Sequence, residues 1–156
     1  MGGGGFMSVT VGRSRRDFQK WGAKIVRPHV EKTGQQLHQK VHVQLDSEMV
    51  FATPVGNVSL WLHPESAPPG YTGGRARGGW QSSIHAPILT EPGTIDPNGT
   101  NTHQAAQNVA AKIPFAVKSF VANAVPYILR LDQGWSTQAP VDFIGRGFDR
   151  VGAQFR

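Results

Sequence analysis

The sequence predicts one α+β domain: a kinked amino-terminal helix, a small, mainly antiparallel sheet of three to five strands, and short helices including a carboxy-terminal amphipathic helix packed on the sheet. Three observations lead to this prediction. The chain has 156 residues, enough for one domain with a substantial core. It is 38% hydrophobic and contains no Cys, so packing or association must stabilise it in place of disulfides. Helical spacing and strand-like runs follow one another along the chain, and none approaches the roughly 20 apolar residues of a membrane span, so a soluble protein is expected.

The basic charge is concentrated at the amino end. Residues 1–44 carry eight Lys and Arg against two acidic residues, so their net charge equals the +6 of the whole chain. Such an asymmetry fits contact with nucleic acid, an acidic protein surface or anionic lipid, and it also fits a merely solvated helix face. The candidate contacts for DNA or an acidic partner are the first five basic residues, Arg13, Arg15, Arg16, Lys20 and Lys24.

The first half of the chain begins with a Gly-rich segment, residues 1–13, which predicts a flexible tail. A helix is expected from Ser14, whose side chain can cap it, with a break or kink where Pro28 removes an amide donor. After Pro28 the helix resumes and ends at Thr53-Pro54. Its predicted apolar stripe is Val30, Leu37, Val41, Leu45 and Met49.

The middle of the chain predicts extended structure. Residues 58–63 alternate weakly like a strand before a run of prolines, which predicts a short strand that leads into a long loop or arm. The Gly-rich residues 73–79 predict a flexible turn, and 80–88 predict a strand that ends at Pro87.

The last third predicts a helix, a strand and two more helices. Asn101 or Thr102 can cap a helix to Lys112, and residues 115–125 predict a central strand. Pro126 can open a short helix that Gly134 closes in a left-handed conformation. A final helix begins at Pro140, and its predicted core stripe is Val141, Ile144, Phe148, Val151 and Phe155.

Two clusters could carry chemistry. His38, His42 and Asp46 are spaced four apart, a geometry that can chelate a transition metal. A polar, solvated flank of an amphipathic helix explains the same residues without a ligand, so we expect no metal. The Gly-rich turn holding Arg75 and Arg77 could bind nucleic acid, or it could lead into the strand while the arginines reach a carboxylate or a neighbour.

The sequence offers little for catalysis. Ser82, Ser83 and His85 lie close together in the chain but form no nucleophile elbow, and ordinary strand residues explain them. No pair of carboxylates falls on one helix face in a setting that would separate the two pKa values. We therefore expect no enzyme activity, no catalytic residues and no cofactor.

One stretch resembles the neck and tail-completion proteins of tailed bacteriophages, which join head to tail. That family carries Asn-x-Val-Pro-Tyr, then an acidic residue, Gly, Ser and Gln-Ala-Pro before its last helix, and an Arg-x-Arg turn into a strand near Trp. Residues 14–156 follow this order, but the insertion at 56–70 replaces a turn of one or two residues. The motif residues here are Arg75, Arg77, Trp80, Asn123, Pro126, Tyr127, Asp132, Gly134, Trp135, Gln138 and Pro140.

The resemblance implies a structural virion protein that forms a ring, of six copies rather than twelve, around the DNA channel at the head-to-tail joint. Its partners would be its own copies, adjacent neck, connector or tail proteins, and packaged double-stranded DNA, with no membrane or small-molecule substrate. It would reside in the virion, after assembly in the host cytoplasm. The motif residues would serve the ring interface. The alternative is a small basic nucleic-acid-binding protein that uses the amino-terminal helix and the Arg75/Arg77 turn.

Overall fold

The computed structural model describes residues 19–20, 22–61 and 63–155. The larger of two compact units is Gly34–Arg156, and the described residues up to Thr33 belong to the other. In the part of the chain that the structure describes, no helix is both long and apolar enough to cross a membrane. The predicted tail at 1–13, the predicted cap at Ser14 and the candidate contacts Arg13, Arg15 and Arg16 lie outside the described residues.

The amino-terminal helix changes type just before its proline. A π-helical segment, η1 (Gly22–Val26), leads into the long helix α2 (Arg27–Ala52). Pro28 is the second residue of α2 and has no amide hydrogen to donate to a carbonyl of the preceding turn, and the change from π-helix to α-helix lies at this place. The irregularity expected at Pro28 therefore precedes it, and Pro28 lies inside the start of the regular helix.

The buried face of α2 matches the predicted stripe only toward the end of the helix. His42, Asp46, Met49 and Val50 are the buried residues of this helix, and Leu45 packs against the core. Val30 and Leu37, the first two residues of the predicted stripe, are exposed. His42 and Asp46 can be buried because the facing strands present hydroxyl groups that form hydrogen bonds with them, as described below. The prediction that His42 and Asp46 lie on a solvated flank is therefore wrong.

The sheet is smaller than predicted. In the described residues it has two antiparallel strands, β1 (Trp80–Ile84) and β2 (Ser119–Asn123), so the expectation of three to five strands is wrong. Trp80 pairs with Asn123 at one end, and Ile84 pairs with Ser119 at the other. The antiparallel arrangement itself, and the two strands expected within 80–88 and 115–125, are confirmed.

The inserted arm contains two short 3₁₀ helices in place of the predicted strand. They are η2 (Val58–Leu60) and η3 (Pro64–Ser66). The side chain of Asn57 accepts a hydrogen bond from the Ser59 amide at 3.1 Å, a local interaction that competes with extended structure. The strand predicted at 58–63 is therefore wrong.

The remaining helices follow the expected order. A short helix stands where a flexible turn was predicted at 73–79, and the other three match predicted helices. They are α3 (Arg75–Gly78), α4 (Thr100–Ala110), α5 (Ile128–Asp132) and α6 (Phe143–Gln154).

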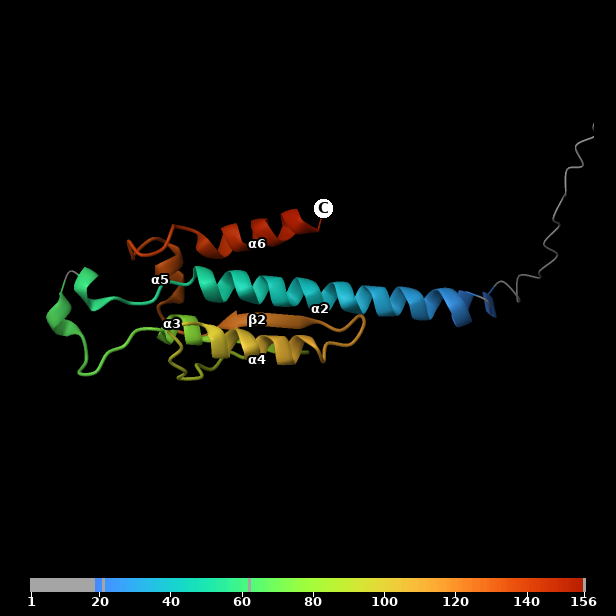
Figure 1. The fold of residues 1–156 in the computed structure, drawn as a ribbon, viewed down its shortest axis with the longest axis horizontal. Coiled ribbons are helices and arrows are strands. Elements are labelled where there is room, and N and C mark those ends of the chain that lie inside the picture. Colours follow the sequence, from blue (N-terminus) through green and yellow to red (C-terminus); the bar gives the residue numbers. More distant parts are fainter. Residues whose placement is uncertain (1–18, 21, 62, 156) are drawn as a thin grey trace, which may run out of the picture. The chain divides into compact units, whose positions relative to one another are not determined.

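Within Gly34–Arg156, α2 is the central layer, with the sheet and α4 on one side and α6 on the other (Figure 1). Arg150 of α6 pairs with Glu48 of α2 at 2.7 Å. Gly147 of α6 faces Met49 so closely that an added Cβ would collide with the Met49 methyl group. The carboxy-terminal helix therefore exists as predicted, but it packs on α2 and not on the sheet.

The core is gathered around the carboxy-terminal end of α2. It comprises Met49, Val50, Ala76, Trp80, Val125, Ile128 and Phe143. On α6 the buried residues are Phe143, Gly147 and Val151, whereas Val141 and Phe148 of the predicted stripe are each 55% exposed. Ile144 and Val151 of the predicted stripe do meet the core or are buried, so the prediction is correct in part. The buried face also includes Gly147, which the close approach to α2 places in the contact.

Thr53 links α2 to the sheet through a buried hydroxyl. It accepts a hydrogen bond from the Trp80 indole at 2.7 Å and donates one to the Met49 carbonyl at 2.6 Å. Thr53→Val keeps the shape of the side chain but leaves the indole N–H without an acceptor, so we expect unfolding to become easier by about 1 to 3 kcal/mol. Urea denaturation measures this. The exposed Thr90→Val is the matched control and should change the value by less than about 0.5 kcal/mol; equal effects would contradict the assigned role of the hydroxyl.

Candidate functional site

A groove of about 650 Å³ lies between the inserted arm and the motif segment. Trp61 and Tyr71 line it from the arm, and Tyr127 and Trp135 line it from the segment around α5. The two arm rings meet edge to face, with centroids 5.0 Å apart. The volume falls in the range of ligand and peptide sites, and the lining is mostly apolar.

Gln138 joins the two walls of the groove. Its amide nitrogen donates to the Val55 carbonyl at 3.1 Å, and its amide oxygen accepts from the Asn57 backbone at 3.2 Å. This side chain therefore pairs with the backbone of the arm as a neighbouring strand would. The motif segment and the insertion, which the sequence treats as separate features, are parts of one site.

Arg75 forms the polar edge of the groove. Its guanidinium donates twice to Glu91, with one distance of 2.8 Å, and lies over the Tyr127 ring at 5.8 Å from the centroid. The hydrogen bonds from Arg75 lower the pKa of Glu91 and raise that of Arg75 itself. Burial raises the pKa of the Tyr127 hydroxyl. The sequence-based reading that the turn arginine reaches a carboxylate is confirmed for Arg75.

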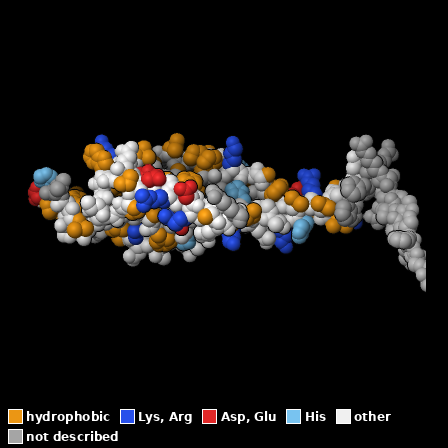
Figure 2. All heavy atoms as spheres, turned by 90° about the horizontal axis from the view of Figure 1, so that it is seen from above, with side chains coloured by type: hydrophobic (Ala, Val, Ile, Leu, Met, Phe, Trp, Pro, Cys, Tyr) orange, Lys and Arg blue, Asp and Glu red, His pale blue; other side chains and the backbone are white. Residues whose placement is uncertain are grey.

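Trp135 stands at the outer rim. It is 74% exposed, and the Arg130 guanidinium lies 5.2 Å from its ring centroid. Nearby, Val141 and Phe148 also expose more than half of their surface. Figure 2, viewed onto α6, shows hydrophobic side chains at the surface beside a group of acidic and basic ones. A surface of this kind is typical of a protein-binding face.

The turn between α5 and α6 is fixed by Asp132. Its carboxylate accepts from the Ile144 amide at 2.9 Å, and its carbonyl accepts from the Asp142 amide at 2.7 Å. Gly134 has φ +88°, the left-handed conformation that the sequence predicts for it. Pro126 and Pro140 are exposed on either side of this passage. The motif therefore sets the direction in which α6 leaves α5.

Other motif residues are internal. Trp80 belongs to the core, and the Asn123 side chain donates to the Ala76 carbonyl at 2.8 Å. Arg77 donates to the carbonyl oxygens of Thr53 and Pro97 at 2.8 and 2.7 Å. These three residues hold the fold together, so they do not offer their side chains to a partner. Of the basic candidates that the structure describes, Lys20 and Lys24 are exposed.

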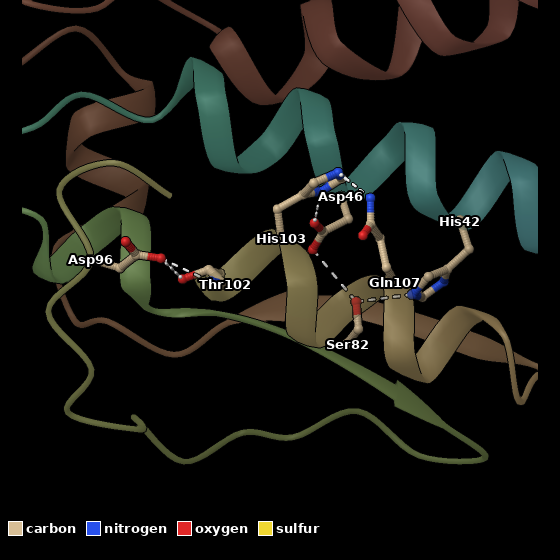
Figure 3. A network of polar contacts seen from close by, with 7 residues as sticks. All are labelled: His42, Asp46, Ser82, Asp96, Thr102, His103 and Gln107. Carbon is tan, nitrogen blue, oxygen red and sulfur yellow. Dashed lines mark hydrogen bonds and ion pairs between the residues drawn. The ribbon is translucent and has the colours of Figure 1, made fainter. Parts of the chain in front are cut away.

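A buried network of polar side chains connects α2, both strands and α4 (Figure 3). His42, only 3% exposed, contacts the hydroxyl of Ser82 through Nε2 and that of Ser119 through Nδ1, each at 2.9 Å. Asp46 is fully buried, and its carboxylate accepts hydrogen bonds from His103 Nδ1 at 2.9 Å and from the Ser82 hydroxyl at 3.5 Å. His38 Nε2 reaches the same Ser119 oxygen at 2.9 Å.

The hydrogen bonds of this network can all be directed toward one acceptor, the carboxylate of Asp46. Gln107 donates to His103 Nε2, which leaves the His103 proton on Nδ1 and directed at Asp46. From the other end, donors can run in sequence through Ser119, His42 and Ser82 to the same carboxylate. Asp46 is therefore the terminal acceptor. Burial raises the pKa of Asp46 to about 6, against the lowering effect of the His103 and Ser82 hydrogen bonds, and burial together with the nearby His38 lowers the pKa of His42.

The metal alternative for the histidine pair finds no support. The nitrogen atoms of His38 and His42 are directed at serine hydroxyls, and no group of three metal-ligating side chains comes together among the described residues. Ser82 belongs to the network, whereas Ser83 donates to the Ala86 carbonyl at 2.7 Å. No pattern in the sequence points to Ser119 or His103, because both join the network from segments distant in the chain.

Asp96 is a second buried carboxylate that the sequence did not single out. It accepts from the Gly99 and Thr102 amides at 3.0 and 2.8 Å and from the Thr102 hydroxyl at 2.8 Å, at the amino end of α4 (Figure 3). Burial by itself would raise the pKa of Asp96, but these hydrogen bonds outweigh it and hold the pKa below its ordinary value. The Asp96-Pro97-Asn98-Gly99 turn that the sequence marks as a loop thus also caps a helix.

Comparison of the chain with protein-family models, with curated proteins and with solved structures found no match.

Proposed function

We propose that the protein is a structural component of a tailed-bacteriophage virion, which forms a ring of copies at the head-to-tail joint around the DNA channel. The observation that supports this most is that some residues of the motif segment fix the local structure while another is exposed. Asp132 and Gly134 fix the direction of α6, and Gln138 fixes the arm, while Trp135 is left exposed. Fixed angles with exposed apolar side chains suit a ring, where an error in each subunit accumulates around the circle.

The surface also favours contacts with neighbouring proteins. Leu129, Trp135, Val141 and Phe148 each expose more than half of their surface around α5 and α6. Exposed large apolar side chains on neighbouring elements are costly in an isolated protein and are explained by a partner. The partners proposed are further copies of the chain and the adjacent neck, connector or tail proteins.

The test is electron microscopy of phage particles that carry this protein. We expect its density in a closed ring at the head-to-tail joint, six copies rather than twelve. Trp135→Ala should leave the circular dichroism spectrum and the melting temperature unchanged but reduce incorporation into particles, because the side chain lies at the rim of the groove and outside the core. A protein found singly in the particle, or absent from purified particles, would contradict the proposal.

The alternative function is binding of nucleic acid by the basic amino-terminal helix. The observation that favours it is that residues 1–44 carry the whole net charge of +6. The Arg75/Arg77 turn adds little to it, because Glu91 and backbone carbonyls already engage both guanidinium groups. If DNA phosphates are bound directly, affinity should fall linearly with log salt, and reversing Arg15 and Arg16 to Glu should reduce the slope by about two. No affinity for DNA at moderate salt would exclude this alternative.

A further inference from the structure

We propose that the aromatic groove binds the proline-rich tip of the arm of a second copy of this chain, residues 63–70, with Pro68 and Pro69 as the anchoring side chains. The inference rests on the proposed function in requiring that copies meet side by side. Its own basis is the chemistry of the groove, the conformation of the arm tip and the charge that each of them carries. The groove and the tip both belong to the compact unit Gly34–Arg156.

The groove presents hydrogen-bond donors on an aromatic surface. Trp61, Tyr71, Tyr127 and Trp135 line it, and their indole N–H and hydroxyl groups form no hydrogen bond with any other described residue. No buried side-chain nitrogen or oxygen of the described residues lacks a partner, so these four groups are accessible to a ligand. An indole N–H can only donate. The occupant that fits is therefore rich in carbonyl acceptors and apolar rings and poor in N–H groups.

A segment with adjacent prolines in the polyproline II conformation has this chemistry. Proline has no N–H, its ring is apolar, and the backbone carbonyls of polyproline II make no internal hydrogen bonds. Aromatic grooves recognise such segments because the conformation exists before binding, so little conformational entropy is lost.

The tip of the arm contains such a segment. Ala67 has φ −67° and ψ 131°, close to polyproline II, and it is followed by Pro68 and Pro69, which are both exposed. A turn ends the segment, because the Tyr71 amide donates to the Pro68 carbonyl at 3.1 Å and Gly70 has φ +74°. The carbonyl groups of Ala67 and Pro69 accept no hydrogen bond from another described residue, so they can accept one from the groove.

The chain's own arm tip does not lie in its groove. None of residues 63–70 lines the groove, although Trp61 and Tyr71, on either side of the tip, do. Hydrogen bonds within the tip hold its shape, such as the bond from the Ala67 amide to the Pro64 carbonyl at 3.2 Å. Figure 1 shows the arm, in green, extending away from α5 and the end of α2. A second copy can bring its tip to the groove without breaking these bonds.

The charges of the tip and the groove are complementary. Glu65 is the acidic residue of the tip, and its side chain is 74% exposed beside His63. At the rim of the groove, Arg130 lies over the Trp135 ring and forms no ion pair with another described residue. Arg75, the arginine that lines the groove, already holds a carboxylate. An incoming tip can therefore place Glu65 beside Arg130, and this pair of opposite charges favours one orientation of the contact.

A second copy is chosen over an unrelated proline-rich protein because of the assembly proposed for this chain. Each copy carries both the groove and the tip, at different places on its surface. The tip of one copy in the groove of the next is a head-to-tail contact, which repeats from copy to copy and can close a ring.

The absence of Cys from the chain allows a direct test by disulfide cross-linking. Full-length Ala67→Cys and full-length Thr137→Cys are mixed under mild oxidation, since Thr137 lines the groove and is exposed. We expect a disulfide-linked dimer whose cross-linked peptides, identified by mass spectrometry, join positions 67 and 137. Ala153→Cys, at an exposed position on α6 outside the groove, replaces Thr137→Cys as the matched control and should give only background linkage.

An exchange of charges tests the orientation. Glu65→Arg in the tip variant, or Arg130→Glu in the groove variant, should reduce the yield of the 67–137 link by about two- to fivefold, the range expected for an exposed ion pair. The two changes together, one in each of the mixed variants, should restore the yield. Both residues are exposed, so the melting temperature should stay the same.

A synthetic peptide of residues 63–70 provides a second measurement. It contains no Trp, so its binding to the full-length chain can be followed through the fluorescence of Trp61 and Trp135 in the groove. The peptide should also suppress the 67–137 cross-link. With Pro68→Ala and Pro69→Ala it should bind at least about tenfold more weakly, because it loses both the anchoring rings and the preformed conformation.

The outcomes separate the possibilities. Linkage at 137 no greater than at 153 would overturn the inference even if the peptide binds, because the groove would then take a proline-rich segment from another protein. A link formed only within one chain in an Ala67→Cys/Thr137→Cys double variant would show that the chain's own tip occupies the groove, and would overturn it as well. Rings seen at the head-to-tail joint without a 67–137 link would refute this contact and leave the proposed function standing. A 67–137 link in a protein absent from particles would do the reverse.

Discussion

Phe143→Ala should lower the free energy of unfolding by about 3 to 5 kcal/mol, because Phe143 is fully buried at the start of α6 and its removal leaves a cavity against the end of α2. For a chain of this length, that loss corresponds to a fall of roughly 6 to 20 °C in melting temperature. Urea denaturation followed by circular dichroism measures the free energy, and calorimetry measures the temperature.

Phe148→Ala is the matched control on the same helix. Its side chain is 55% exposed, so the same substitution should cost less than about 1 kcal/mol in the monomer. Similar losses from both variants would show that Phe148 is buried in solution, and the assignment of the α6 faces would then be wrong. A small loss from Phe148→Ala combined with weaker assembly would instead support its role in contacts between copies.

The second large effect concerns pH and Asp46. The folded-state pKa of Asp46, about 6, lies above its ordinary value of 3.8, so between these pH values the folded protein binds a proton that the unfolded chain does not. Stability contributed by this group is therefore present at low pH and is lost as pH rises through about 6. At about 1.4 kcal/mol per pH unit, the loss amounts to about 3 kcal/mol.

Asp46→Asn removes this titration. Relative to the parent protein, the variant should lack the fall in unfolding free energy between pH 4 and pH 7, measured by urea titrations at several pH values. His42→Gln is the matched comparison with the opposite sign. The lowered pKa of His42 means that the unfolded chain takes up the proton first, so this histidine costs stability as pH falls below 6.5. Parallel pH profiles for the parent and Asp46→Asn would contradict the buried, proton-binding state of the carboxylate.

Local signals in the sequence predicted most of the elements. The prolines around 126–140 and the alternation within 80–88 predicted helices and a strand close to those observed. The helix expected up to Lys112 also exists, but its N-cap is Gly99 and not Asn101 or Thr102. The same local reasoning placed Gly134 in the left-handed conformation that it has. These features depend on residues near one another in the chain, which is why sequence alone suffices for them.

The faces of the helices were not predictable in the same way. Hydrophobic spacing pointed to Leu37 and Phe148 as core residues, yet both are exposed. The polar face of α2 is buried because Ser82 and Ser119 meet His42 from strands 40 and 77 residues away. No local pattern reports such partners. The groove is of the same kind, since it forms only when Gln138 pairs with an arm more than 80 residues earlier.

Gln138 also has a mechanical consequence. Its two hydrogen bonds attach the arm to the loop whose other end Asp132 fastens to the start of α6. Breaking these two bonds would therefore release the arm from the loop that leads to α6, while the pairing of β1 with β2 stays intact.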